Sequence, residues 1–209
     1  MKHFKARPSA LGKLMSKSKK PGELSQTCIT YLKTWYSGDV EELDSKYLTK
    51  GILLENEAIE FASKVLYGGI KAYKNEDIYS NEWLVGTPDV ILENSIIDTK
   101  CAWNRKTFLD SALELNSDYE WQLRGYMMLC NKDFATLFYY LGDTPAAANY
   151  GTKISYSHLE DFERWVSYEF KRDEAIEQEI IDKVEQCRQW LKVYDANIQE
   201  RIGTRIINL

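Results

Sequence analysis

The fold of this chain is decided by the stretch Gly86-Thr-Pro-Asp-Val-Ile-Leu-Glu-Asn-Ser-Ile-Ile-Asp-Thr-Lys100. Two runs of β-branched and aliphatic residues flank the polar turn Glu93-Asn-Ser95, which is typical of a β-hairpin. We expect Asp89 on the first strand and Asp98 with Lys100 on the second. Because side chains alternate along a strand, Asp98 and Lys100 share one face. Two carboxylates and an ammonium therefore converge in an otherwise apolar hairpin.

Charges in apolar surroundings are costly unless they are paired or hold a metal ion. One interpretation is an ordinary exposed hairpin with a surface ion pair between Asp98 and Lys100. The other interpretation is a metal-dependent site. Three features favour it: the Asp-Thr-Lys triplet lies in strand sequence, Pro88-Asp89 precedes it by one hairpin, and a helix with Glu55 precedes both.

That helix is predicted from about Tyr47 to Tyr67, where Gly68-Gly69 ends it. Glu55 falls on its apolar stripe, in line with residues at helical spacing: Leu48, Ile52, Ile59 and Ala62. An acid on a buried stripe indicates a functional role. The alternative is a glutamate at the helix edge that is paired with a lysine.

A second pair of candidate residues lies after the hairpin, where Gln122 and Tyr126 are four apart on a predicted helix and share a face. Asp118 is expected to cap that helix, which runs to Cys130. Around it we predict an α/β layer with helices on both faces of a mixed sheet. Its other elements are helices at Ser25–Tyr36 and Thr107–Leu115, a strand at Phe134–Leu141 and a helical region from Ser157 to about Arg201.

With these residues the sequence resembles the PD-(D/E)XK nuclease superfamily, whose pattern reads here as Glu55, Pro88-Asp89 and Asp98-Thr99-Lys100. Gly51-x-x-x-Glu55 and Gln122-x-x-x-Tyr126 resemble its lambda-exonuclease-like, or YqaJ-type viral recombinase, branch. The resemblance covers roughly residues 7 to 142.

The resemblance implies an α/β, restriction-endonuclease-like core in which helices flank a mixed central β-sheet. Residues 1–150 would form this core with a basic N-terminal arm. Residues 151–209 would form a helical C-terminal extension packed on the same domain.

The resemblance also implies a metal-dependent DNA nuclease, most simply an exonuclease on linear double-stranded DNA in phage-type recombination or end processing. Asp89 and Asp98 would bind Mg²⁺ or Mn²⁺, which prefer hard oxygen ligands. The Thr99 carbonyl and Glu55 would complete that metal site, and Lys100 would polarise the attacking water. Further implied roles are that Gln122 positions Lys100 or the phosphate and that Tyr126 stiffens the arrangement from behind.

Expected DNA contacts are basic or hydroxyl side chains: Arg7, Ser9, Lys13, Arg105 and Arg124. By resemblance, the partners would be double-stranded DNA with a free end, a single-strand annealing recombinase and further copies of the chain in a homo-oligomer. Two alternatives stay open: an endonuclease of the restriction or resolvase type, and a non-catalytic DNA-binding module with the nuclease fold.

The composition of the 209 residues limits these functions further. The net charge is −5, yet the first 22 residues contain seven lysines and arginines and no acid, which suits a basic arm that meets phosphate or a disordered basic tail. No apolar run approaches the ~20 residues of a membrane span. The four cysteines are scattered, so we expect reduced thiols, a cytoplasmic location (of the bacterial host, for a phage protein) and no iron–sulfur cluster.

Overall fold

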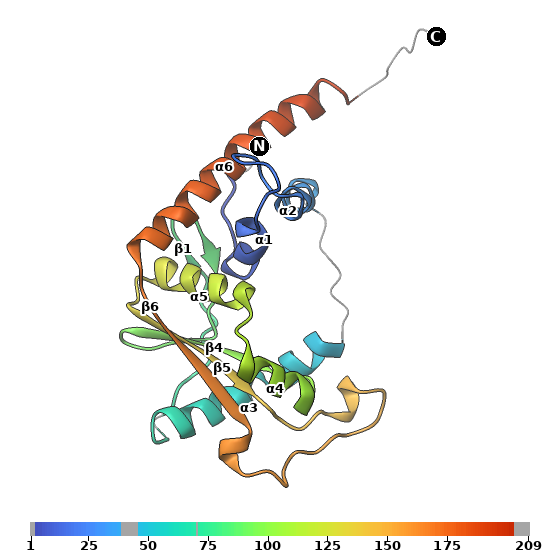
Figure 1. Cartoon of the computed structure of the whole chain (residues 1–209), viewed down its shortest axis with the longest axis vertical. Helices are drawn as coiled ribbons and strands as arrows, with labels where there is room; N and C mark the ends of the chain where they lie inside the picture. Colours follow the sequence, from blue (N-terminus) through green and yellow to red (C-terminus); the bar gives the residue numbers. More distant parts are fainter. Residues whose placement is uncertain (1–2, 39–45, 70, 203–209) are drawn as a thin grey trace.

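The computed structural model describes residues 3–38, 46–69 and 71–202 and shows one mixed β-sheet with helices on both faces (Figure 1). The sheet has the order β3-β4-β5-β6. Its strands are β3 (Val90–Ile91), β4 (Ser95–Cys101), β5 (Phe134–Tyr140) and β6 (Trp165–Lys171). β4 and β5 are parallel, and the other two pairs are antiparallel. The predicted α/β fold with a mixed central sheet is confirmed.

Helices and short elements surround the sheet. The α-helices are α1 (Leu11–Met15), α2 (Gln26–Ser37), α3 (Lys46–Leu66), α4 (Arg105–Leu113), α5 (Ser117–Cys130) and α6 (Glu174–Gln199). The 3₁₀ turns are η1 (Pro8–Ala10), η2 (Ala146–Ala148) and η3 (Asp161–Glu163), and β1 (Tyr79–Ser80) pairs with β2 (Val85–Gly86) as a small separate ribbon.

The predicted hairpin is present as β3 and β4, with Val90 opposite Ile97. The amide of Leu92 donates to the Ser95 carbonyl at 2.8 Å and closes the turn between the two strands. Asp89 stands one residue before β3 rather than on it. The hairpin nevertheless brings Asp89 beside Thr99 on β4. Asp89 therefore lies next to the Asp98-Thr99-Lys100 triplet, as the predicted site requires.

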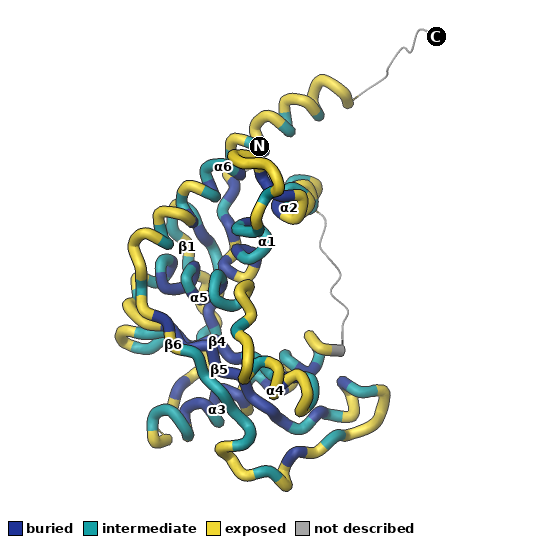
Figure 2. Tube along the Cα trace, viewed as in Figure 1, coloured by how far each residue is buried: buried dark blue, intermediate teal, exposed yellow. Residues whose placement is uncertain are grey.

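The chain passes from β4 to the parallel strand β5 through α4 and α5. A parallel pair requires such a crossover, and here it lays α5 across one face of the sheet. On that face Ile96, Leu123 and Leu137 belong to a core shared with α1, α2 and α6. On the opposite face Ile97 and Phe138 pack against α3. Burial is concentrated in the sheet between these helices (Figure 2).

Part of the basic N-terminal segment, from Phe4 to Leu14, contributes buried side chains to this core and is not a loose tail. Phe4, Ala6 and Leu14 are fully buried, and the Ala6 backbone bonds to Trp83 and Val85 beside the β1–β2 ribbon. The segment packs closely because α5 has a glycine where it passes: a Cβ at position 125 would lie 2.4 Å from a methyl of Leu11. Its charges must therefore be tested by substitution rather than by deletion.

The region after residue 150 differs from the predicted helical extension. Trp165–Lys171 is strand β6, paired along its length with β5, and only Glu174–Gln199 is helical. The prediction of a helical region from Ser157 was therefore wrong for the part before Glu174. The apolar side chains there fit helical spacing, but their partner strand lies some 30 residues earlier and leaves no local signal.

The buried stripe of α3 also differs from the prediction. Leu48 and Ile52 are 45% and 64% exposed, whereas the core-facing positions are Lys50, Leu54, Ala58 and Ala62. The predicted stripe was therefore wrong in its first two turns, where that side of α3 faces a cleft.

Lys50 is fully buried, with its ammonium bonded to four oxygens. The acceptors are the carbonyls of Ala102, Trp103 and Gly142 and the Thr144 hydroxyl, at 2.8–3.1 Å. This lysine ties the start of α3 to the segments that follow β4 and β5.

In the described part of the chain, no helix combines the length and the apolar character that crossing a membrane requires. The four cysteines are unbridged, and two of them meet where α2 packs on α6: the sulfurs of Cys28 and Cys187 are 3.7 Å apart.

Candidate active site

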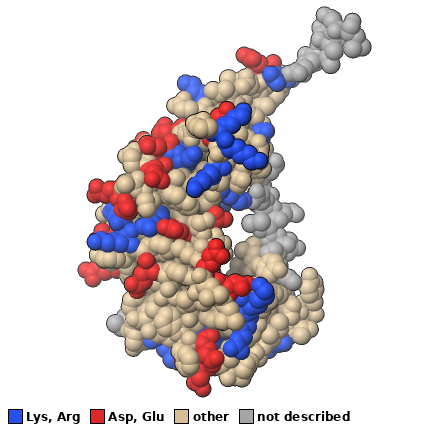
Figure 3. Space-filling model, in the orientation of Figure 1, with Lys and Arg blue, Asp and Glu red and all other residues tan. Residues whose placement is uncertain are grey.

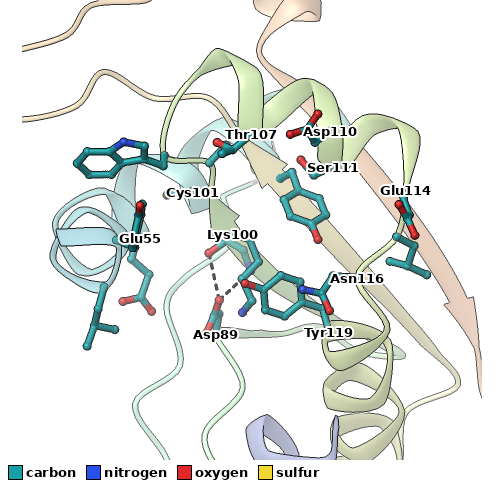
Figure 4. A pocket seen from close by; sticks show the side chains of 18 of the residues that line it. Glu55, Asp89, Lys100, Cys101, Thr107, Asp110, Ser111, Glu114, Asn116 and Tyr119 are labelled. Atoms are coloured by element: carbon teal, nitrogen blue, oxygen red, sulfur yellow. Dashed lines mark hydrogen bonds between the residues drawn. The ribbon is translucent and has the colours of Figure 1, made fainter. Parts of the chain in front are cut away.

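A cleft of about 1040 Å³ opens between α3, α4 and the start of α5, with the end of β4 as its floor. Figure 4 shows Glu55 reaching from α3 on one side, Glu114 from the C-terminal end of α4 on the other, and Asp89, Lys100 and Tyr119 between them. The topology explains the convergence, because the hairpin, the crossover helix and the long helix α3 all meet at β4.

Asp89 is held in place by the strand beside it. Its Oδ2 accepts hydrogen bonds from the Thr99 amide at 2.8 Å and from the Thr99 hydroxyl at 3.1 Å. Behind it, the Asp89 carbonyl accepts from the Asn75 amide at 2.7 Å, and Pro88 is buried. Both side-chain bonds go to one oxygen, so the carboxylate has a fixed orientation at the cleft.

Asp98 is fully buried beneath the cleft. Gln122 donates to its Oδ1 at 2.9 Å, and the Lys100 ammonium forms an ion pair at Oδ2. Oδ2 accepts no well-formed hydrogen bond from the described residues. Burial raises the pKa of Asp98 to about 7, against the opposing effect of Lys100. A further positive charge at this oxygen would stabilise the ionised form.

Lys100 lies between the buried aspartate and the open cleft. Burial by itself lowers its pKa, but the charges of Asp98 and Asp89 outweigh that effect and raise the pKa above its ordinary value. The ammonium also lies 5.0 Å from the ring centre of Tyr119, and the rings of Tyr119 and Tyr139 pack edge-on with their centroids 6.0 Å apart. Lys100 is therefore a fixed point charge that stays protonated at neutral pH.

Tyr119 was missing from the residues expected in the site, although it lines the cleft beside Lys100 (Figure 4). The sequence does contain a signal for it. Tyr119 stands three residues before Gln122 on the same predicted helix, so both side chains point to the same side.

Glu55 lines the cleft, but its partner is a lysine. Its Oε2 is 2.8 Å from the ammonium of Lys74, and the two side chains are 23% and 39% exposed. This is the arrangement that the alternative interpretation of Glu55 anticipated. Nothing in the pattern around Lys74, in the segment before the hairpin, indicated that it would reach the site.

The pair on α5 supports the site from behind. Gln122 bonds to the Asp98 carboxylate, where we expected it to position Lys100 or the phosphate. The Tyr126 hydroxyl donates to the Thr87 carbonyl at 3.0 Å and so holds the turn that leads into Asp89. Burial raises the pKa of Tyr126 to about 12, which keeps that hydroxyl a donor.

The residues expected to contact DNA lie outside the lining of this cleft. Arg7 and Ser9 are exposed at η1, and Lys13 on α1 lies 5.9 Å from the ring centre of Tyr31. Arg124 faces the sheet, where it donates to the Lys171 carbonyl at 2.7 Å, and Arg105 is 3.7 Å from a carboxylate oxygen of Glu163. Figure 3 shows basic side chains gathered over the α1–α2 end of the molecule.

The donor set at the floor suits a hard divalent cation. It consists of the Asp89 and Asp98 carboxylates and the Thr99 carbonyl, and the buried Asp98 Oδ2 has the Lys100 ammonium beside it but accepts no well-formed hydrogen bond from the described residues. Across the residues described here, no three His, Cys, Asp or Glu side chains gather closely enough to hold a metal. A metal at this site would therefore rest on two carboxylates, with Glu55 set apart by its bond to Lys74.

Comparisons with solved structures match nearly the whole chain. A phage-related exonuclease from Haemophilus somnus 129PT superposes with a TM-score of 0.80 and 26% identity, covering 96% of this chain and 97% of that one. This chain has the fold of the phage-type exonucleases. The resemblance deduced from the hairpin and the α5 pair is thereby confirmed, and it extends past residue 142 to include β6 and α6.

A second match lies further away in sequence. An alkaline exonuclease (LHK-Exo) from Laribacter hongkongensis has a TM-score of 0.68 at 15% identity, covering 94% of this chain and 92% of that one. The same enzyme in complex with dAMP gives a TM-score of 0.69 at 16% identity. No family model and no curated protein matches this chain by sequence.

Proposed function

We propose that this protein is a divalent-metal-dependent exonuclease that degrades linear double-stranded DNA from an end, in phage-type recombination or DNA end processing. The observation that carries the proposal is the convergence of Asp89 and Lys100 in one cleft of a phage-type exonuclease fold, with Asp98 buried directly beneath and paired with Lys100. The Laribacter enzyme of the same fold binds dAMP, which supports a nucleotide as the group that this cleft holds. The host cytoplasm would be the place of action.

The roles of the residues follow from their contacts. Asp89, Asp98 and the Thr99 carbonyl would hold Mg²⁺ or Mn²⁺, which when bound neutralises phosphate charge and lowers the pKa of an attacking water. Thr99 fixes one oxygen of Asp89 by two bonds, and Gln122 fixes one oxygen of Asp98. Each carboxylate therefore presents its other oxygen in a set direction.

Lys100 supplies the positive charge on the side of the cleft open to substrate. Its ammonium would orient the water and stabilise negative charge that develops on the scissile phosphate. Tyr119 keeps that ammonium in position through its ring face. Glu55, set apart by Lys74, would join the site only if that ion pair opens.

The test is a time course on linear and on closed circular plasmid in Mg²⁺ and Mn²⁺. Loss of the linear form, with the circle intact, is expected. Discrete fragments from intact circles would instead mean an endonuclease, and no cleavage of either form would leave a DNA-binding module. Comparing linear DNA with and without a 5′ phosphate, for the wild type and for Arg7→Ala and Ser9→Ala variants, then measures whether these two residues recognise an end.

A further inference from the structure

Lys74 belongs to the irregular segment between α3 and β1, yet its side chain reaches two acids of the cleft. Its ammonium lies 2.8 Å from Oε2 of Glu55. The bond to Glu55 raises the pKa of Lys74 above its ordinary value, and the charge of Asp89 adds to that effect. Glu55 and Asp89 both line the cleft. Lys74 is therefore a second lysine, besides Lys100, whose charge acts on the acids of the candidate active site.

The segment that carries Lys74 is tied to the turn that carries Asp89. The backbone amide of the next residue, Asn75, donates to the Asp89 carbonyl at 2.7 Å. The side-chain amide of Asn75 donates to the Pro88 carbonyl at 3.0 Å. The backbone of Lys74 is thus held beside Asp89, and its side chain is held by Glu55 on α3. Its position next to the two acids is built into the fold.

The ion pair between Lys74 and Glu55 is of the kind that another cation can replace. The two side chains are 39% and 23% exposed, and ion pairs in contact with water are weak. The pair between Lys100 and Asp98 differs, because the Asp98 side chain is only 1% exposed. A divalent cation binds carboxylate oxygens and repels an ammonium close to it. Such a cation and Lys74 therefore compete for the carboxylate of Glu55.

We propose that Lys74 is a positioning residue that competes with the divalent cation for Glu55 and so lowers the affinity of the cleft for the metal. The proposal rests on the proposed metal-dependent nuclease function and adds a residue that tunes its metal site. While the ion pair is closed, only the carboxylates of Asp89 and Asp98 are available to a metal. When the pair opens, Glu55 can add a third carboxylate.

The test measures metal binding to the DNA-free protein, so that it does not depend on cleavage. The electron paramagnetic resonance signal of free Mn²⁺ gives the dissociation constant of Mn²⁺ for the wild type and for Lys74→Met, which removes the charge and keeps much of the side-chain length. Lys74→Met should bind Mn²⁺ about fivefold more tightly, which is the upper range for a partly exposed ion pair. Damage to the fold would weaken binding, so a merely structural role of Lys74 does not produce this gain.

A double-mutant cycle with Glu55→Gln decides whether the effect passes through Glu55. In the Glu55→Gln background, Lys74→Met should change Mn²⁺ affinity by less than about twofold. Lys74→Arg should keep the wild-type affinity, because it retains the positive charge beside Glu55. The matched control is Lys71→Met, which removes a lysine three residues earlier whose ammonium lies 5.2 Å from the ring centre of Tyr73. It should leave Mn²⁺ affinity within about twofold of the wild type.

The outcomes separate this proposal from the nuclease proposal. Mn²⁺ binding by Lys74→Met that is unchanged or weaker would overturn the competition for Glu55. An equal tightening in the Glu55→Gln background, or from Lys71→Met, would also overturn it, because the effect would then be one of general charge. Each of these results leaves the nuclease proposal intact. A wild type that binds no Mn²⁺ would overturn both.

Discussion

Replacing the buried Lys50 by methionine should destabilise the fold by about 3 kcal/mol. Methionine has a similar length but no donor, so the three N–H groups that serve four oxygens at 2.8–3.1 Å are lost. At roughly 2 kcal/mol for each of three hydrogen bonds from a charged donor, that loss is about 6 kcal/mol. The opposing gain comes from no longer burying an ammonium: burial lowers the pKa of Lys50 from 10.5 to about 8, which corresponds to roughly 3 kcal/mol.

The assay is urea unfolding of the wild type and Lys50→Met at pH 7, followed by circular dichroism. The matched control is Lys64→Met, which removes a lysine whose side chain is 65% exposed on the same helix and should change stability by less than about 1 kcal/mol. A Lys50→Met variant as stable as the wild type would refute the claim that these hydrogen bonds outweigh the cost of burial.

The pH dependence of folding stability provides a second test of Lys50. Since the folded pKa lies below the unfolded value, the unfolded chain holds this proton between pH 8 and 10.5 whereas the folded chain has released it. The stability of the wild type relative to Lys50→Met should therefore increase as the pH rises through that window. A difference that stays constant or shrinks there would show that Lys50 keeps its ordinary pKa in the folded protein.

Three further predictions concern DNA. Lys100→Ala should abolish cleavage while the dissociation constant for DNA changes by less than about threefold, because the ammonium acts on the attacking water. If cleavage and DNA binding were lost in parallel, Lys100 would be only a phosphate contact. Tyr119→Leu should lower kcat about tenfold at unchanged KM, and Tyr119→Phe should restore it, because only the ring face is needed; a Phe variant as slow as Leu would point to the hydroxyl. Lys17→Glu, on the exposed basic segment, should weaken binding and reduce the salt slope by about one, and an unchanged slope would exclude Lys17 from the DNA interface.

Much of the fold and site followed from local sequence because their signals are local. Asp98 and Lys100 lie on one strand of the hairpin, and Gln122 lies with Tyr126 on one helix. The periodicity of each element therefore predicts which side of it these side chains occupy. The pairing of β3 with β4 then places Asp89 within hydrogen-bond distance of Thr99.

The features that sequence reasoning missed depend on distant partners. β6 is a strand only because β5 is there to pair with it. Lys50 looks like a surface lysine until carbonyls from segments about 50 and 90 residues later surround it. The partner of Glu55, Lys74, comes from an irregular segment whose path no periodicity describes. In each case tertiary contacts override the local pattern.

The most direct test of the account is the metal dependence of the Asp98 carboxylate. Protein stripped with EDTA is titrated with Mg²⁺ while release of nucleotides from linear double-stranded DNA is measured, for the wild type and for Asp98→Asn, which keeps the size of the side chain and removes its charge. The account predicts that Mg²⁺ restores the wild type, whereas Asp98→Asn stays inactive at every concentration despite an unchanged circular dichroism spectrum. Cleavage by the EDTA-stripped wild type before Mg²⁺ is added, or by Asp98→Asn at wild-type rates, would contradict it.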